Sequence, residues 1–167
     1  LELPPPVTSP HFVWALDRKA TRSFSGPAYG DASAFKITNE VIRCGIGVVQ
    51  TAGAEGDDVI AVLLCAFPSV VQMVPLAEAY GLLAYLIHVA NGPFEYATDC
   101  AWVVTSFGLG RQAVTAASCV GADLWRNIFA CAENLGAALV VRKVKAHTAR
   151  VAIETGMISL ADRNGNG

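Results

Sequence analysis

The sequence has few charged residues and no surplus of basic ones. Only 16% of its 167 residues are charged, and the formal net charge is −2. Proteins bind nucleic acid largely through Lys and Arg side chains that neutralise phosphates, so the overall charge does not indicate such a partner. Any site for a polyanion must therefore be local. The hydrophobic content of 53% excludes the disordered class and is ample for a core.

Long apolar runs are absent as well. The longest cover residues 59–68 and 79–87, and prolines 68 and 75 lie between them. A helix that spans a membrane needs about 20 consecutive apolar residues, and neither run is that long. The sequence therefore predicts two buried core elements and no membrane partner.

Paired-cysteine motifs and a secretory signal pattern are also missing. The five cysteines include no CxxC pair and lie mostly among apolar neighbours. This predicts free, buried thiols in an intracellular protein that is not secreted, in the nucleus or the cytoplasm. The sequence begins at Leu1 and closes on a Gly/Asn-rich stretch, which we interpret as part of a longer polypeptide.

The order of the elements predicts an α/β fold. Residues 1–25 begin with "LELPPPVTSP", which indicates a linker or tail, so we expect one domain over residues 26–167. The remaining patterns predict a hairpin, then helix, strand, helix and strand, at residues 41–50 with 59–67, then 74–92, 94–98, 121–136 and 137–147. Asp123 is the expected N-cap of the second helix. A strand–helix–strand order requires a parallel pair, so we expect a mixed sheet with helices packed on it.

Three acidic residues stand in unexpectedly apolar surroundings. Asp99 follows a strand in "FEYATDCAWVV", Asp31 follows another in "AYGDASAF", and Glu78 is the only acid in a nearly all-apolar helix. An unpaired carboxylate in such a place is costly unless it is paired or binds a metal ion. Mg²⁺ prefers carboxylate oxygens, and two such ions can activate water for phosphodiester hydrolysis. Acids at strand ends and on an adjoining helix could converge for that chemistry.

Each acid also has a purely structural interpretation. Asp31 could be a turn residue, Asp99 could cap the following helix, and Glu78 could complement a helix dipole in a first turn. Spacing in the sequence does not separate these alternatives from metal binding.

Seven segments, in order, resemble the type 1 ribonuclease H family. They are "YGDASAF" (29–35), "CGIGVV" (44–49), "AEAYGLLAYL" (77–86), "YATDCAWVV" (96–104), "GADLWRNIF" (121–129), "VVRKVKAHTA" (140–149) and "ADRNGNG" (161–167). The resemblance implies a ribonuclease H-like mixed five-stranded sheet with helices packed on it. It also implies hydrolysis of the RNA strand of an RNA–DNA hybrid with two Mg²⁺ ions, or Mn²⁺ in their place.

The same resemblance assigns roles by position. Asp31, Glu78 and Asp99 become metal-binding catalytic carboxylates, and His147 becomes a catalytic histidine on a mobile loop. Ser33 is retained from the family's first motif and is a candidate substrate contact. The basic residues that flank His147 are the candidates for phosphate contacts, namely Arg142, Lys143, Lys145 and Arg150.

The sequence departs from the family pattern in three ways. Gly30 and Ala32 replace the usual Thr and Gly around Asp31, and residues 105–120 contain a single base, so a basic hybrid-binding protrusion is not evident. The fourth carboxylate and the last helix of the family would lie beyond Gly167. Asp162 is interpreted as a loop residue, and we expect the apolar surface to be partly uncovered.

Two functions of different classes follow. The first is a metal-dependent endonuclease that cuts RNA–DNA hybrids, as one domain of a retroelement polyprotein. The alternative is a non-catalytic ribonuclease H-like module that binds nucleic acid or serves as a scaffold. Other nucleases and transposases of this fold are a third interpretation, which the "KAHTA" segment disfavours.

Overall fold

The computed structural model describes residues 8–52 and 58–145, and the elements below belong to these ranges. They follow one another as β1 (Phe12–Asp17), β2 (Phe24–Ser25), β3 (Ala28–Lys36), β4 (Ile42–Ala52), β5 (Asp58–Ala66), α1 (Val74–His88), β6 (Val89–Asn91), β7 (Glu95–Thr98), α2 (Ala101–Leu109), α3 (Arg111–Val114), α4 (Ala122–Asn134) and β8 (Val140–Lys143). None of the described helices is both long and apolar enough to cross a membrane.

The main sheet has six strands in the order β1-β5-β4-β3-β7-β8. The pairs β1–β5, β5–β4 and β4–β3 are antiparallel, whereas β3–β7 and β7–β8 are parallel. The sheet is therefore mixed, as the sequence predicted, and the hairpin expected from residues 41–67 is β4–β5. A separate two-stranded sheet pairs β2 with β6.

The main sheet has one strand more than the five that were expected, and the additional strand is β1. β1 pairs with β5 from Phe12 to Asp17, inside the segment that was interpreted as a linker up to residue 25. The Trp14 side chain of β1 packs against β2 and the end of α1, with its ring centroid 5.1 Å from that of Phe24 and 5.5 Å from that of His88. The linker interpretation is thus wrong for β1 and β2, because both strands belong to the folded domain.

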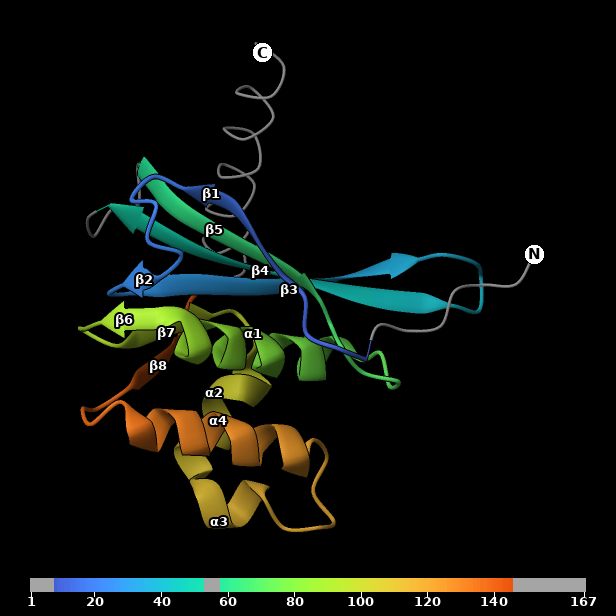
Figure 1. The fold of residues 1–167 in the computed structure, drawn as a ribbon. Helices are drawn as coiled ribbons and strands as arrows, with labels where there is room; N and C mark the ends of the chain where they lie inside the picture. Colours follow the sequence, from blue (N-terminus) through green and yellow to red (C-terminus); the bar gives the residue numbers. More distant parts are fainter. Residues whose placement is uncertain (1–7, 53–57, 146–167) are drawn as a thin grey trace.

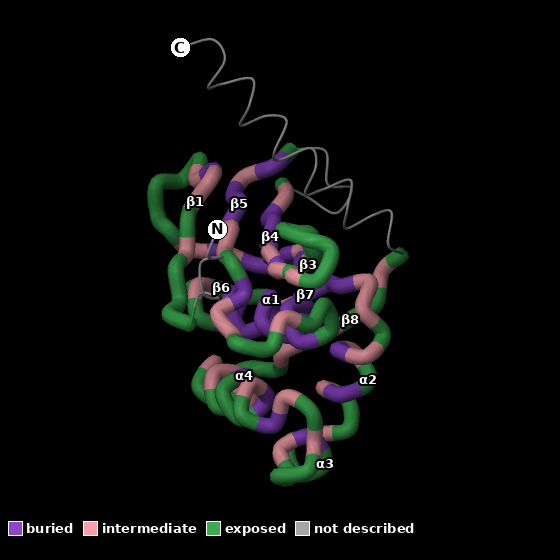
Figure 2. The backbone as a smooth tube through the Cα atoms, turned by 90° about the vertical axis from the view of Figure 1, so that its right-hand side faces the viewer, coloured by how far each residue is buried: buried purple, intermediate pink, exposed green. Residues whose placement is uncertain are grey.

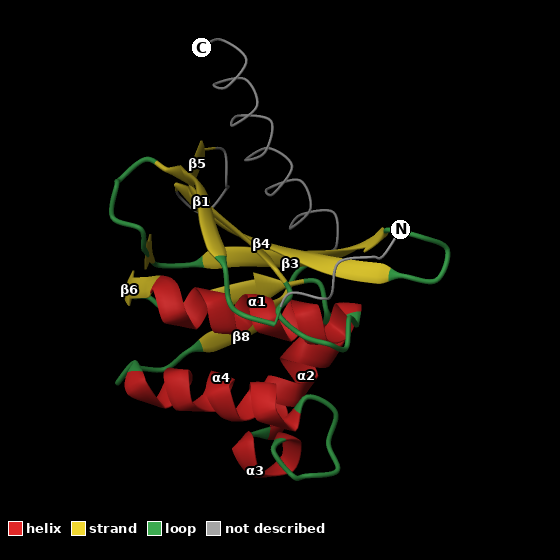
Figure 3. Cartoon of the chain, turned by 45° about the vertical axis from the view of Figure 1, so that its right-hand side comes forward, coloured by secondary structure: helices red, strands yellow, loops and turns green. Residues whose placement is uncertain are grey.

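The described helices lie on one side of the sheet (Figures 1 and 3). α1 packs directly against β3 and β4, and α4 packs against α1. α1 is buried on nearly all sides because the sheet covers one side and the other helices cover another, which explains its almost uniformly apolar sequence. Figure 2 shows the buried residues concentrated in the central strands and in α1.

Two details differ from the sequence analysis. α4 begins at Ala122 with Gly121 as its N-cap, so Asp123 is not the cap and instead forms an ion pair with Arg126. All five cysteines are free, as predicted, but only Cys44 is buried, and the other four are partly exposed.

Candidate metal centre

Three structural elements bring three carboxylates together. Asp31 lies on β3, Glu78 lies on α1, and Asp99 follows the last residue of β7. One carboxylate oxygen from each of them lies within 4.8 Å of the other two. Among the described residues, this convergence joins the three acids that the sequence singled out.

The geometry excludes the structural interpretations of these acids. Asp31 lies inside β3, where it pairs with Gly47, so it is neither a turn residue nor at the end of a strand as the sequence suggested. Glu78 lies beyond the first turn of α1, which contains no acid. Cys100 is the N-cap of α2, and that helix has no side-chain cap. None of the three acids therefore has a local structural role that explains it.

Glu78 is the most deeply buried member, with 4% of its surface exposed. Its Oε1 accepts a hydrogen bond from the backbone N–H of Ala32 at 3.1 Å, and its Oε2 accepts one from Thr98 Oγ1 at 3.4 Å. Burial raises the pKa of Glu78 to about 8, the Ala32 N–H opposes this, and the charges of Asp31 and Asp99 add to the rise. A bound cation would reverse this balance, because it favours the ionised carboxylate.

Thr98 is a further member of this site that was not predicted from the sequence. Thr98 is fully buried, and its hydroxyl also accepts a hydrogen bond from the backbone N–H of Cys100 at 3.1 Å. It therefore connects the buried carboxylate of Glu78 to the turn that carries Asp99. The signal in the sequence was a hydroxyl residue directly before Asp99, at the end of an apolar strand.

The residues fit a hard divalent cation. All three side chains offer oxygen atoms, they come from separate secondary-structure elements, and Asp31 and Asp99 remain partly exposed on the side open to solvent. Mg²⁺ and Mn²⁺ bind such oxygen donors and retain water molecules in their remaining positions. Asp31, Glu78 and Asp99 would hold the ion or ions.

Two lysines stand beside the carboxylates. Lys143 pairs with Thr98 in the register of β7 and β8, and the N–H of Val144 donates to the Thr98 carbonyl at 3.0 Å. A pocket of about 460 Å³ is lined by Asp99, Lys143, Val144 and Lys145. Two of the predicted phosphate contacts, Lys143 and Lys145, thus lie next to Asp99. Arg142, a third predicted contact, instead forms an ion pair with Glu95.

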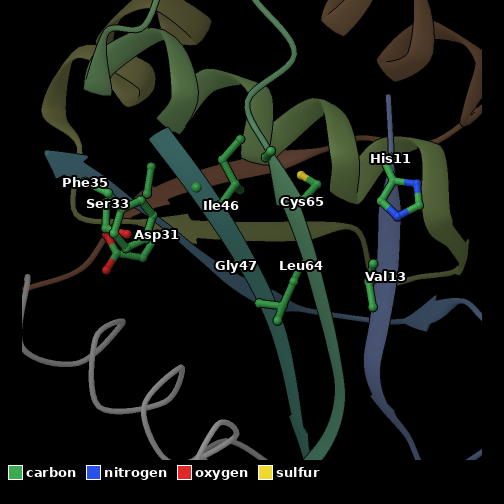
Figure 4. A pocket seen from close by; sticks show the side chains of 12 residues that line it. His11, Val13, Asp31, Ser33, Phe35, Ile46, Gly47, Leu64 and Cys65 are labelled. Atoms are coloured by element: carbon green, nitrogen blue, oxygen red, sulfur yellow. The ribbon is translucent and has the colours of Figure 1, made fainter. Parts of the chain in front are cut away.

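Ser33 lies on the same face of β3 as Asp31, two residues further along. Both line an apolar pocket of about 490 Å³ on the sheet face opposite α1, and Gly47 and Leu64 contribute to its floor (Figure 4). Figure 4 shows Phe35 beside Ser33 and Asp31 on one side of this pocket, with Val13 and His11 on the other. The position of Ser33 allows contact with a substrate that reaches Asp31.

Three sequence predictions fall outside the described residues. His147, Arg150 and Asp162 lie beyond residue 145, as do the last motif and the expected place of the last helix. His88, which matched no motif, packs its ring against Phe12 at 4.6 Å between centroids, and its Nδ1 lies 2.7 Å from the Ala84 carbonyl oxygen.

Comparison with known proteins gives the fold. No family profile matches the sequence, and no curated protein sequence matches it. The solved RNase H domain of prototype foamy virus (PFV) has a TM-score of 0.56 and 16% sequence identity, over 80% of this chain and 94% of that domain. The foamy viral protease–reverse transcriptase in complex with RNA/DNA hybrid gives 0.56 and 16%, over 77% of this chain.

An RNase H domain from outside the viruses is also similar. The N-terminal RNase H domain of a Mycobacterium tuberculosis protein, solved as a fusion with maltose-binding protein, has a TM-score of 0.50 and 17% identity over 83% of this chain. The described part of this chain therefore has a ribonuclease H-like fold. It spans 19% of the foamy viral protease–reverse transcriptase and 94% of the separate PFV domain.

Proposed function

We propose that this chain is a divergent type 1 ribonuclease H, a metal-dependent endonuclease that hydrolyses the RNA strand of RNA–DNA hybrids. The observation that carries the proposal is the convergence of Asp31, Glu78 and Asp99 from three elements to within 4.8 Å. The fold supports the proposal, because the solved domains that it resembles are described as RNase H domains. We further propose that the chain acts as one domain of a longer retroelement-type polyprotein.

The alternative of a non-catalytic module is less well supported. A buried carboxylate with a raised pKa reduces stability unless it gains a partner when it is ionised. Glu78 is such a carboxylate, and the approach of Asp31 and Asp99 to it adds like-charge repulsion, which is a costly feature for a scaffold. It is a useful feature for a protein that binds a divalent cation.

We propose a role for each residue of the site. Divalent cations, when bound, would activate a water and stabilise the leaving oxygen of the phosphodiester. Glu78 is held from two sides by Ala32 and Thr98, so it presents a fixed oxygen pair to the site. Lys143 and Lys145 are exposed beside Asp99 and would bind phosphates of the hybrid, and Ser33 would contact the strand that lies over Asp31. His147 is proposed to assist proton movement or product release.

The test is cleavage of a hybrid labelled on its RNA strand, in Mg²⁺, by this chain and by the complete natural polypeptide that contains it. We expect cutting of the RNA strand that falls at least about a hundredfold in Asp99→Asn, because a metal ligand loses its charge. Asp123→Asn is the matched control, since Asp123 is exposed on α4 and pairs with Arg126. A folded wild-type protein that leaves the RNA strand intact contradicts the proposal.

A further inference from the structure

Tyr96 is a fully enclosed side chain near the candidate metal centre, and it has no assigned role. It lies on β7, three residues before Asp99, and it is completely buried. Among the described residues its hydroxyl has no hydrogen-bond partner. A buried, unpaired hydroxyl costs free energy, so its presence calls for a compensating role.

The hydroxyl fills space that two glycines leave open. A Cβ at Gly30 would lie 1.6 Å from the Tyr96 hydroxyl oxygen, and a Cβ at Gly81 would lie 2.5 Å from it. Neither glycine has a positive φ, so the reason for glycine at both places is the close approach of the tyrosine. The ring of Tyr96 is thus wedged between the backbones of β3 and α1.

These two glycines are neighbours of the metal-binding acids. Gly30 directly precedes Asp31, and Gly81 lies one helical turn after Glu78 on α1. The charges of Glu78 and Asp31 contribute, after burial, to a raised pKa of Tyr96, which agrees with their proximity. Tyr96 thus belongs to the strand that precedes Asp99, and its side chain contacts the two elements that carry Asp31 and Glu78.

We infer that Tyr96 is a positioning residue of the proposed metal centre, whose hydroxyl sets the spacing of β3 and α1 and thereby the separation of Asp31, Glu78 and Asp99. This inference depends on the proposed function, because the spacing matters only if the acids share a cation. The unpaired hydroxyl is then retained for its volume and in spite of its cost to stability. Tyr96 need not touch substrate or metal to act in this way.

The test is Mn²⁺ binding to the whole chain, measured by isothermal titration calorimetry, alongside thermal unfolding without metal. For Tyr96→Phe we expect about tenfold weaker Mn²⁺ binding, as is typical when a residue that orients a ligand is changed. The melting temperature should be no lower than that of the wild type, because an unsatisfied hydroxyl has been removed. If Tyr96 had a purely structural role, Mn²⁺ affinity would not fall while the melting temperature was maintained.

Tyr85→Phe is the matched control. Tyr85 is equally buried, but its hydroxyl donates to the Gly26 carbonyl at 2.7 Å and accepts from the Glu95 N–H at 3.2 Å. Its loss should lower the melting temperature and leave Mn²⁺ affinity unchanged. Equal weakening of Mn²⁺ binding in both variants would overturn the inference, since it would reflect general loosening.

A second variant fills the space of the missing hydroxyl with a methyl group on α1. In Gly81→Ala combined with Tyr96→Phe, the new methyl lies 3.7 Å from the ring carbon that bore the hydroxyl and 3.2 Å from Ile46 Cγ2. We expect this double variant to recover most of the Mn²⁺ affinity that Tyr96→Phe loses.

The outcomes separate this inference from the proposed function. Wild-type affinity in Tyr96→Phe, or no recovery in the double variant, contradicts the spacing role and leaves the metal centre intact. A wild-type chain that binds no Mn²⁺ contradicts the metal centre itself, and the role of Tyr96 with it.

Discussion

Glu78 couples the stability of the metal-free protein to pH. Burial raises its pKa in the folded state to about 8, against 4.5 as the ordinary value. Between these values the folded protein holds one proton more than the unfolded chain, so the free energy of unfolding falls as pH rises. Below about pH 4.5 Glu78 is protonated in both the folded and the unfolded state. Above about pH 8 it is ionised in both, and the decrease in the free energy of unfolding is complete.

We therefore predict that, in a chelator, the free energy of unfolding falls by up to about 1.4 kcal/mol per pH unit between pH 5 and 8. Glu78→Gln should abolish most of this slope, whereas Glu133→Gln, at an exposed ion pair with Arg111, should keep it. Urea denaturation at several pH values measures the effect. A slope that survives in Glu78→Gln would assign the titration to another group.

The candidate site was predictable from the sequence where acidic residues stand in otherwise apolar segments. Asp31, Glu78 and Asp99 were visible as acids in apolar segments, and the structure brings them together. Thr98 and Tyr96 were not predictable, because a threonine or tyrosine in a strand is ordinary. Their importance depends on contacts with Glu78 and Gly30, which lie far away in the sequence.

Among the elements, those with strong local patterns were predicted best. The hairpin β4–β5 and the helix α4 lie close to their expected bounds. The helix α1 begins at Val74 as expected, but it ends at His88 and β6 follows, so its predicted end at residue 92 was wrong. β1 was missed because it is an edge strand next to a proline-rich stretch, with a register shift between Trp14 and Leu16. Its partner β5 begins more than 40 residues after it, so its pairing has no local signal.

The packing of β1 leads to a prediction for Trp14. Its ring contacts Phe24 and His88, so Trp14→Ala should lower the free energy of unfolding by about 2 kcal/mol through the loss of buried apolar surface. Val13→Ala, on the opposite and more exposed face of the same strand, should change it by less than about 0.5 kcal/mol. Chemical denaturation measures both. An unchanged stability in Trp14→Ala would mean that β1 contributes little to the folded domain.

The charge of the whole molecule implies that the proposed binding of nucleic acid would depend on a few basic side chains. With a net charge of −2, general attraction to phosphates is absent, and the exposed Lys143 and Lys145 beside Asp99 provide the local positive charge. Each phosphate contact contributes close to one unit to the slope of log affinity against log salt concentration. The proposed hybrid complex should therefore have a shallow salt dependence, to which these lysines contribute a large share.

We predict that Lys143→Ala combined with Lys145→Ala weakens binding to an RNA–DNA hybrid and reduces the salt slope by about 1 to 2. Fluorescence anisotropy in Ca²⁺, over a series of salt concentrations, measures both quantities. Arg18→Ala combined with Arg126→Ala is the control, because it changes the net charge equally at residues that already pair with Asp58 and Asp123. If the two double variants lose the same affinity and slope, the attraction is set by total charge and the lysines beside Asp99 are not the phosphate contacts.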